Sequence, residues 1–345
     1  MKAAIFKKAG VMAVEDREMP TIQKPTDAIV RIVRTCVCGS DLWWYRGIDQ
    51  ERMAADSQVG HEGIGVIEEV GSDVTDFKKG DFVIIPFGLS CGVCANCRAG
   101  RFTNCVQSQW LTSGQSEYAY VQNANGSFDK IPDGDYTEEQ LASILTLSDV
   151  MGTGYHAAIS AQVKPGDTVA VVGDGAVGLC GVIAAKMLGA KRIVAMSRHE
   201  DRQVLAKEFG ATDIIAERGE EGVTKAKALT EEGVGFDAVL ECVGSDLSMQ
   251  TAIQLARPGA IVGTVGVPHG VNIPFPTIFF GSIGVQGGPA PSHAYADILL
   301  RAVLDGEINP GKVFNFTTDL DHIAEAYEKM DKREAIKSYV KVSER

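Results

Sequence analysis

The pattern of hydrophobic and polar positions divides the chain into two regions. In the first, residues 1–135, short apolar runs alternate with Gly, Pro and Asp, as at 3–6, 28–33, 63–70 and 81–85. Runs of this length between turn residues predict β-strands. Because too few residues separate them for connecting helices, we expect a twisted and mostly antiparallel β-domain.

The second region begins at about residue 151, where strand-like and helical patterns alternate. The strand-like runs lie at 168–172, 192–196, 213–215, 236–240, 260–265 and 283–287. The helical patterns lie at 175–188, 201–209, 223–229 and 247–255, and two more, near 294–304 and 323–330, complete the chain. This alternation is typical of a doubly wound parallel sheet, so the predicted fold class is α/β.

A glycine-rich turn follows the first strand of the second region. It consists of Gly173, Asp174, Gly175, Ala176, Val177 and Gly178. In such a turn Gly173 permits the tight bend, Gly175 lets the backbone approach a pyrophosphate, and Gly178 lets the next helix pack closely on the strand. The first N–H groups of that helix, at Ala176 and Val177, then face the phosphates. The strand before the turn and the helix after it indicate a dinucleotide-binding site.

The end of the second strand bears on which dinucleotide is bound. An NAD site has Asp or Glu there, about 20 residues after the glycines, to bind the ribose 2′-hydroxyl. This chain has Ser197 at that point, followed by Arg198, with Arg218 after the third strand as a weaker candidate. A carboxylate repels a 2′-phosphate, whereas an arginine binds it through paired hydrogen bonds. We therefore expect NADP(H) to be preferred over NAD(H); the alternative is that Arg198 is an ordinary solvated residue at a helix start.

Length and composition are those of a two-domain globular protein. The chain has 345 residues, of which 45% are hydrophobic and 23% charged, and its formal net charge is −12. That charge argues against a nucleic-acid or anionic-membrane surface. No run approaches the roughly 18 apolar residues of a membrane span, and the first residues lack the apolar segment of a signal peptide. We therefore expect a cytoplasmic protein whose eight cysteines are thiols or metal ligands rather than disulfides.

Four of the cysteines lie close together in the sequence. They are Cys91, Cys94, Cys97 and Cys105. Two-residue spacers let neighbouring thiols turn onto one ion, and four sulfur ligands suit a closed tetrahedral zinc site. The alternative is a set of buried structural thiols, which the polar neighbours Asn96, Arg98 and Arg101 disfavour. Because four sulfurs leave no open position, we expect this zinc to be structural.

A second group of metal-type residues is more dispersed. A catalytic zinc needs about three protein ligands and one open position. From residue types alone, the first ligand would be Cys38 or Cys36 and the second would be His61. The third would be either Glu62 or a distant carboxylate. The alternative is that His61 is a hydrogen-bonded residue in a turn and that both cysteines belong to the core.

Four segments in a fixed order resemble one known family. They are CGSD at 38–41, GHE at 60–62, the four-cysteine segment at 91–105 and GDGAVG at 173–178. Together they resemble the zinc-dependent medium-chain dehydrogenase/reductase family, the alcohol dehydrogenase group, and most of all its bacterial NADP-dependent secondary-alcohol branch. The resemblance implies a GroES-like catalytic domain at 1–150 and 288–345 and a Rossmann dinucleotide-binding domain at 151–287.

The resemblance also implies the ligands of a catalytic zinc. These would be Cys38 and His61, with Asp149 at the position where many relatives have Cys. Cys36 does not match a ligand position and is interpreted as a core residue. A different interpretation of Asp149 is an N-cap for a helix over 150–161.

Further residues near this zinc follow from the same resemblance. Glu62 would be a carboxylate able to approach the metal, and Asp41 would orient His61. Ser40 would pass a proton outward. The family often has His two residues after the Asp of this motif, where this chain has Trp43, so the last step of the proton path departs from the family.

The remaining implied positions concern the substrate, the cofactor and assembly. Trp43 and Trp44 point different ways, so one is expected to line a substrate pocket shared with Trp110 and the other to pack in the core. By resemblance, the cofactor path is also lined by Val243, Val265 and Gly266. The apolar run 278–283 is expected to expose strand edges, which predicts a homodimer or homotetramer.

These observations predict a zinc-dependent oxidoreductase that transfers hydride between NADP(H) and a secondary or small alcohol, or its ketone or aldehyde. Each chain would carry two zinc ions, one catalytic and one structural. A polyol, sugar or threonine-type dehydrogenase of the same family is an alternative. An alternative of another class is a non-catalytic dinucleotide sensor with only the structural zinc, which the presence of Cys38, His61 and Asp149 disfavours.

Overall fold

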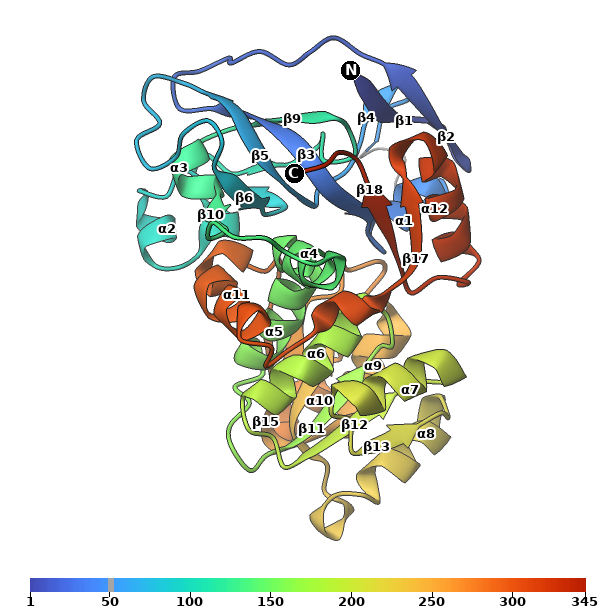
Figure 1. Ribbon diagram of the computed structural model, residues 1–345. Coiled ribbons are helices and arrows are strands. Elements are labelled where there is room, and N and C mark those ends of the chain that lie inside the picture. Colours follow the sequence, from blue (N-terminus) through green and yellow to red (C-terminus); the bar gives the residue numbers. More distant parts are fainter. Residues whose placement is uncertain (49–52) are drawn as a thin grey trace. The chain divides into compact units, whose positions relative to one another are not determined.

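The computed structural model describes residues 1–48 and 53–345, which form two compact units. The first unit combines Met1–Asp149 with Pro291–Arg345, and the second is Val150–Ala290. In Figure 1 the first unit therefore contains both the blue and the red ends of the chain. Because the chain returns to its first unit, residues near both termini can contribute to one site there.

The first unit is built around the long strand β3 (Ala28–Val37). One edge of β3 pairs with β5 (Gly63–Val70), and the other pairs with β9 (Tyr118–Val121) near the start of β3 and with β18 (Lys337–Lys341) near its end. The same sheet includes β6 (Phe82–Ile85), β10 (Asp129–Lys130) and β17 (Phe314–Asp319). Two smaller sheets contain β1 (Lys2–Lys8), β2 (Val11–Asp16) and β4 (Ser57–Gln58), and β7 (Gly88–Leu89) with β8 (Gln109–Trp110). The three pairings of β3 are antiparallel, which confirms the predicted β-rich domain.

The last strand of the chain, β18, is buried along most of its length, from residue 337 to residue 340. It pairs Ser338 with Val37 and Tyr339 with Cys36. This register brings Lys337 to the point where β3 ends and the chain continues into Cys38. A residue from the C-terminal strand therefore lies beside a motif from the N-terminal region.

Two helices of the first unit, α1 (Asp41–Tyr45) and α12 (Ile323–Asp331), pack on each other through aromatic side chains. The Trp44 ring centroid lies 5.0 Å from that of Phe6 and 5.5 Å from that of Tyr327. Trp44 is only 7% exposed, whereas Trp43 is partly exposed. Of the two adjacent tryptophans, Trp44 is thus the one that packs in the core.

In the part of the chain that the structure describes, the first unit contains four other α-helices. They are α2 (Ala95–Arg98), α3 (Ala124–Ser127), α4 (Glu138–Leu145) and α11 (Ala296–Leu304). Just before α11, His293 Nδ1 lies 2.6 Å from Asp129 Oδ1, and the His293 ring packs edge-on against Phe102. These contacts join the returning C-terminal segment to β10 and to the four-cysteine segment.

The second unit is a sheet of six parallel strands in the order β13-β12-β11-β14-β15-β16. The strands are β11 (Thr168–Val172), β12 (Arg192–Met196), β13 (Asp213–Ile215), β14 (Phe236–Glu241), β15 (Ala256–Thr264) and β16 (Gly284–Gly287). Numbered within the unit, this is the 3-2-1-4-5-6 order of the Rossmann fold. It confirms the predicted α/β class and doubly wound sheet.

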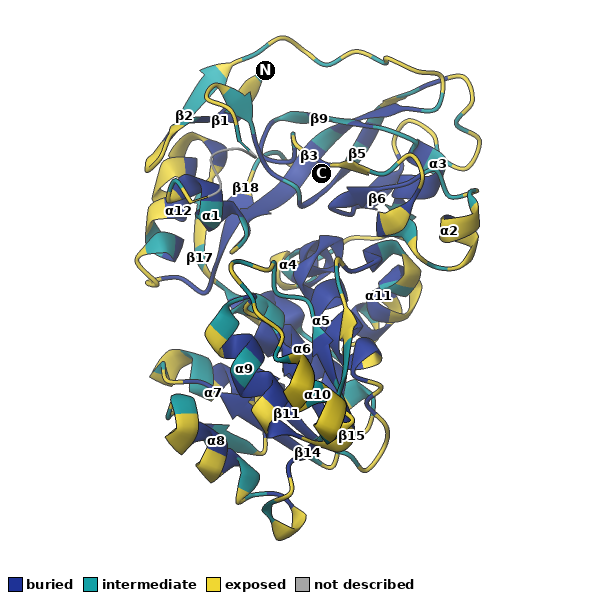
Figure 2. Cartoon of the chain, turned by 180° about the vertical axis from the view of Figure 1, so that it is seen from behind, coloured by how far each residue is buried: buried dark blue, intermediate teal, exposed yellow. Residues whose placement is uncertain are grey.

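Helices cover both faces of this parallel sheet. They are α5 (Val150–Ser160), α6 (Ala176–Met187), α7 (Glu200–Phe209), α8 (Gly219–Lys227) and α9 (Asp246–Leu255). Helices α5, α6 and α7 pack along one face, and α8 and α9 pack along the other. The central strands β11, β12 and β14 are therefore buried on both sides, as their mostly apolar sequences require. Figure 2 shows the dark blue strands of this unit between helices with yellow outer faces.

The structure differs from the expected exposed strand edge at residues 278–283. The run falls mostly in the helix α10 (Phe275–Gly281), and the edge strand β16 begins only at Gly284. A proline in the first turn favours the helix, and Ser282, with φ of +51°, ends it. The apolar side chains that remain exposed are those of Phe275, Phe279 and Phe280.

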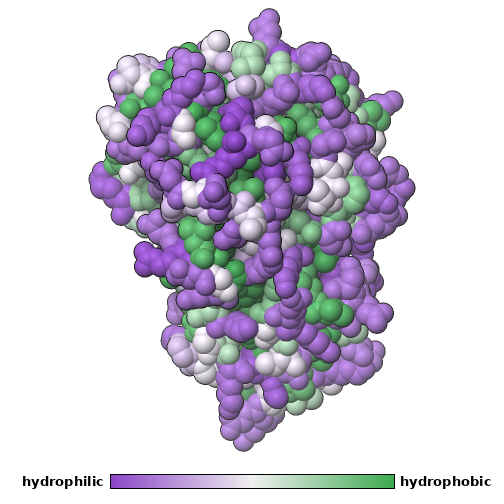
Figure 3. All heavy atoms as spheres, viewed as in Figure 1, coloured by the Kyte–Doolittle hydropathy of each residue, from purple (hydrophilic) through white to green (hydrophobic). Residues whose placement is uncertain are grey.

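The face of the molecule shown in Figure 3 is mostly hydrophilic. Within residues 1–48 and 53–345, every helix is too short or too polar to span a lipid bilayer.

Candidate active site

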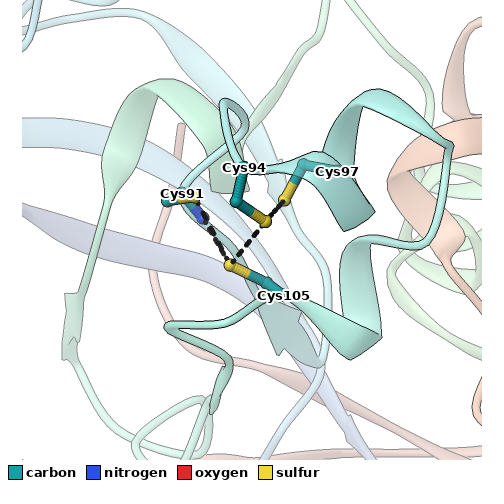
Figure 4. Close-up of side chains that lie close together, drawn as sticks. All are labelled: Cys91, Cys94, Cys97 and Cys105. Carbon is teal, nitrogen blue, oxygen red and sulfur yellow. Dashed lines mark hydrogen bonds between the residues drawn. The ribbon is translucent and has the colours of Figure 1, made fainter.

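The four cysteines of segment 91–105, in the first unit, converge on one point (Figure 4). The sulfur–sulfur distances are 3.4 Å for Cys94–Cys97, 3.9 Å for Cys94–Cys105 and 3.5 Å for Cys91–Cys105. Disulfide sulfurs lie only about 2.05 Å apart, so these are separate thiols. A tetrahedral zinc with Zn–S bonds of about 2.3 Å has sulfur–sulfur edges of about 3.8 Å, which matches this arrangement.

The pKa values of two of these thiols are also compatible with a bound cation. Backbone N–H groups, first that of Cys97, lower the pKa of Cys94 to about 6. Burial, together with hydrogen bonds to Cys94 and Cys105, raises the pKa of Cys97 to about 12. Cys94 is thus ready to bind as a thiolate, whereas Cys97 requires a nearby positive charge to lose its proton.

A second cluster in the first unit brings together four side chains from three separate segments of the sequence. Ligand atoms of Cys38, His61, Glu62 and Asp149 all lie within 4.8 Å of one another. Asp149 Oδ2 is 3.5 Å from Cys38 Sγ and 3.4 Å from His61 Nε2. His61 Nε2 is also 4.0 Å from Glu62 Oε1. Thiolate, imidazole and carboxylate are the ligand types that zinc accepts, so this cluster can hold a metal ion.

Each of these side chains comes from the end of an element. Cys38 directly follows β3, and His61 and Glu62 precede β5. Asp149 lies between a 3-10 turn and α5. Since β3 and β5 are antiparallel neighbours, Thr35 pairs with Gly63, and the residues just beyond that pair meet at one end of the sheet.

Asp41 orients the imidazole of this cluster. Its Oδ1 lies 3.2 Å from His61 Nδ1, and its Oδ2 accepts a hydrogen bond from the Cys38 backbone N–H at 3.0 Å. The Nε2 atom of His61 is therefore the one that faces Cys38 and Asp149. Burial opposes a charge on His61, but the carboxylates of Asp41 and Asp149 outweigh it and raise the pKa of His61 well above its usual value.

Gln115 is a supporting residue that the sequence did not identify. Its side-chain amide donates to the Cys36 carbonyl at 3.0 Å and contacts Asp41 Oδ2 at 3.5 Å, while its oxygen accepts from the Tyr327 hydroxyl at 2.9 Å. A Cβ at Gly60 would lie 2.3 Å from the Gln115 backbone nitrogen, so only glycine fits there, at φ of +101°. The close approach fixes the segment that carries the predicted histidine ligand.

Lys337 is a second residue that the sequence did not identify. Its Nζ lies 2.6 Å from Glu62 Oε1 and donates to the Val37 carbonyl at 3.2 Å, and both members of the ion pair are only 1% exposed. Burial opposes a charged lysine, but the surrounding acidic groups, among them Glu62 and Asp149, raise the pKa of Lys337 well above its usual value. One buried cation thus accompanies the acidic cluster.

Cys36 lies outside this cluster, although it is close in sequence. It is buried in β3, opposite Tyr339 of β18. Burial raises the pKa of its thiol well above the usual value, which favours the neutral form. The structure therefore places Cys36 in the core and brings Cys38 to the other candidate ligands.

An aromatic wall extends from the cluster toward solvent. Phe87 packs edge-on against the His61 ring, with centroids 6.5 Å apart. Trp110 stacks on Phe87 with centroids 5.6 Å apart and is 53% exposed. Ser40, at the start of α1, and Trp43 are both partly exposed. Groups bound at the cluster would therefore meet Phe87 and Trp110 as an apolar surface.

The glycine turn of the second unit has the geometry that its sequence predicts. Gly173 has φ of +118°, and a Cβ at Gly178 would lie 1.9 Å from the Gly173 carbonyl oxygen. A Cβ at Gly175 would meet nothing within 4 Å, so the space in front of the turn is open. Ala176 and Val177 begin α6. The turn can accept a phosphate close to its backbone and the helix N–H groups.

Ser197 and the predicted arginines differ in how they are placed. Ser197 is buried at the end of β12, and its hydroxyl donates to Asp174 Oδ2 at 2.9 Å. Arg198 is exposed, and Arg218 is exposed at the start of α8. Arg202 Nη1 lies 3.3 Å from Asp174 Oδ1, and no motif in the sequence pointed to a role for either residue.

The loops that carry Val243, Val265 and Gly266 are held by one buried carboxylate. Glu241 accepts hydrogen bonds from the backbone N–H of Val243 at 2.9 Å and from the Thr264 hydroxyl at 2.9 Å. A Cβ at Gly266 would lie 2.0 Å from the Gly244 nitrogen. The loops that follow β14 and β15 therefore lie against each other at the same edge of the sheet as the glycine turn.

Two protein-family models match the chain. The alcohol dehydrogenase GroES-like domain matches residues 24–133, and the zinc-binding dehydrogenase domain matches residues 176–303. The first match contains Cys38, His61 and the four-cysteine segment.

Similar proteins cover nearly the whole chain. Zinc-type alcohol dehydrogenase B of Aspergillus flavus is 32% identical over 95% of this chain and 78% of its own length. Sorbitol dehydrogenase of Bacillus subtilis is 33% identical over 83% of this chain and 81% of its own. Among solved structures, alcohol dehydrogenase TADH from Thermus sp. ATN1 is 31% identical, with a TM-score of 0.90 over 99% of this chain and 100% of that one.

The buried ion pair leads to a prediction about stability. Lys337→Met leaves the Glu62 carboxylate buried without its cation, so we expect the free energy of unfolding to fall by about 3–5 kcal/mol, measured by urea denaturation. Lys332→Met, which removes an exposed ion pair with Glu328, should change it little. The double variant Lys337→Met/Glu62→Met should recover much of the loss. Equal small effects of both lysine variants would contradict a stabilising role for the buried pair.

Proposed function

Because this chain belongs to the zinc-dependent medium-chain alcohol dehydrogenase family, we propose that it transfers hydride between NADP(H) and a secondary or small alcohol, or its ketone or aldehyde. The observation that carries the proposal is the convergence of Cys38, His61 and Asp149 within 4.8 Å beside an apolar wall. A site with three ligands of these types and an open fourth position is what a catalytic zinc needs.

The residues around this cluster would have three separate roles: binding zinc, orienting His61 and transferring a proton. Cys38, His61 and Asp149 would hold the catalytic zinc, with Glu62 within reach. Bound there, zinc supplies the Lewis acidity that favours ionisation of an alcohol hydroxyl. Asp41 keeps His61 Nε2 directed at the cluster. Ser40 would take up the hydroxyl proton while it releases its own hydroxyl proton to water, because the indole N–H of Trp43 only donates a hydrogen bond and cannot accept the proton.

The four cysteines would hold a second, structural zinc. Cys91, Cys94, Cys97 and Cys105 fill all positions of a tetrahedron, which leaves none for a substrate. Each chain would then carry two zinc ions with different roles.

The second unit would bind the dinucleotide. The open space at Gly175 and the start of α6 would receive the pyrophosphate. The absence of an acid at Ser197 and the exposed Arg198 support a preference for NADP(H) over NAD(H). Val243, Val265 and Gly266 would line the path of the nicotinamide, whose hydride chemistry belongs to the cofactor.

The aromatic wall favours a substrate with an apolar side. Phe87 and Trp110 offer stacked rings beside His61, which suits an alkyl or aryl group better than a polyol. The similarity to a sorbitol dehydrogenase keeps polyols as the second candidate class.

The exposed aromatic residues of α10 would mediate assembly. Phe275, Phe279 and Phe280 lie on one short helix, next in sequence to the edge strand β16. An exposed apolar patch beside an unpaired strand edge suits self-association, so we propose a homodimer or homotetramer formed through the second unit.

Metal analysis tests the proposed enzyme against a sensor. The wild-type chain should contain two zinc ions and oxidise alcohols, whereas a sensor would contain one zinc ion and turn over nothing. Cys38→Ala should remove one zinc ion and abolish turnover while leaving the melting temperature nearly unchanged. Cys94→Ala should also remove one zinc ion, but its main effect should be a lower melting temperature. A Cys38→Ala variant with wild-type turnover would disprove the assignment of the catalytic ligands.

The apolar wall predicts which variant changes substrate size. Trp110→Ala enlarges the space beside Phe87, so kcat/KM for bulky ketones should rise about tenfold relative to that for small ones. The matched variant Trp44→Phe alters a core tryptophan and should affect stability without changing this ratio. If Trp110→Ala leaves the ratio of kcat/KM for bulky and small ketones as unchanged as Trp44→Phe does, the substrate does not bind beside Trp110.

The patch on α10 predicts a change in molecular mass. Phe280→Asp introduces a charge where Phe280 is 85% exposed, so it should leave the fold intact and dissociate the oligomer, measured by sedimentation velocity. Val204→Asp places the same charge at an exposed valine of α7 and should leave the oligomer unchanged. A wild-type monomer, or equal masses for both variants, would refute this interface.

A further inference from the structure

We propose that Asp174, in the glycine turn, determines how strongly the site discriminates between a ribose 2′-phosphate and a free 2′-hydroxyl. The inference rests on the dinucleotide site proposed above. It concerns a carboxylate inside the turn, whereas the usual discriminating acid follows the second strand.

Asp174 makes contacts that hold its carboxylate in one place. Its Oδ2 accepts the Ser197 hydroxyl at 2.9 Å, and its Oδ1 lies 3.3 Å from Arg202 Nη1. The same guanidinium nitrogen lies 3.3 Å from the Asp174 carbonyl oxygen. Both charged side chains are only 11% exposed. The turn is therefore fastened to the end of β12 and to the first turn of α7.

These contacts bring the Asp174 carboxylate to the end of β12, where the sequence has Ser197 instead of an acidic residue. β11 and β12 are parallel neighbours, and Val172 pairs with Met196, so Asp174 and Ser197 follow adjacent strand ends. Ser197 is 1% exposed, and its hydroxyl is already donated to Asp174. Ser197 is thus an anchor for Asp174, and the acidic group beside the adenosine ribose position comes from the turn.

The charge of this carboxylate opposes the charge of a 2′-phosphate. Two like charges a few ångströms apart near a protein surface repel each other, and this repulsion disfavours a bound 2′-phosphate. Arg202 neutralises part of the Asp174 charge, while the exposed Arg198 and Arg218 remain available to a phosphate. These opposing charges give NADP(H) only a moderate advantage over NAD(H). The Asp174 carboxylate is the group that limits this advantage.

Binding measurements on the full-length zinc-loaded protein test this inference. Dissociation constants for NADPH and NADH come from nicotinamide fluorescence, and those for 2′,5′-ADP and 5′-AMP come from calorimetry. Asp174→Asn keeps the size of the side chain and removes its charge. It should raise the affinity for the 2′-phosphorylated member of each pair by about tenfold relative to the other. A ratio within twofold of the wild-type ratio would overturn the proposal.

A matched variant separates a local from a general charge effect. Asp201→Asn removes the same charge from an exposed residue in the first turn of α7, one position before Arg202. It should leave both affinity ratios unchanged. An equal shift in Asp201→Asn and Asp174→Asn would assign the effect to overall charge and refute a specific role for Asp174. If Asp174→Asn does not fold, Asp174→Ser is used, with the same expected direction.

A double-variant cycle tests the role of Arg202. If Arg202 acts as the counter-ion of Asp174, Arg202→Gln lowers the relative affinity for NADPH in the wild type and has little effect in the Asp174→Asn background. An equal effect in both backgrounds would show that Arg202 binds the phosphate itself and overturn the counter-ion role.

Failure of this inference is distinguishable from failure of the proposed function. A wild-type protein that prefers NADH refutes the proposed cofactor preference, yet a tenfold shift in Asp174→Asn still supports the role of Asp174. A wild-type protein that binds none of the four probes overturns both.

Discussion

The ion pair between Lys337 and Glu62 joins the last strand of the chain to the segment that carries His61. Its two charges lie 2.6 Å apart and are almost completely buried, so neither can exchange its partner for water. Removing one partner from such a pair leaves an uncompensated charge in a poorly solvated place. The pair therefore requires β18 to be in register with β3. The geometry of the candidate site depends in this way on the chain returning to its first unit.

Features encoded by neighbouring residues could be predicted from the sequence. The four cysteines lie within one short segment, in which two-residue spacers bring Cys91, Cys94 and Cys97 together and a short loop leads back to Cys105. The glycine turn could likewise be predicted, because the steric requirements for its three glycines arise within a few residues of the turn. The central strands of the second unit, β11, β12 and β14, are mostly apolar, as their burial on both faces demands.

Features that depend on distant segments could not be predicted in the same way. Lys337 is 275 positions from Glu62 in the sequence and resembles any lysine in a terminal strand. Gln115 gains its role only where β-domain loops meet Tyr327 of α12. The helix α10 was expected as a strand edge because an apolar run of this length fits either structure, and periodicity alone does not distinguish them.

The two metal-type clusters show that ligand number alone does not determine what a site can do. Each offers four candidate ligands within 4.8 Å. Around the cysteines the additional contacts are backbone N–H groups, such as those of Cys91 and Gln107 to Cys105 Sγ, which stabilise negative sulfur without competing for it. In the other cluster, Lys337 already engages Glu62. A cation bound by Cys38, His61 and Asp149 would thus meet a fourth candidate ligand, the Glu62 carboxylate, that already has another partner, and this keeps one coordination position available to a substrate.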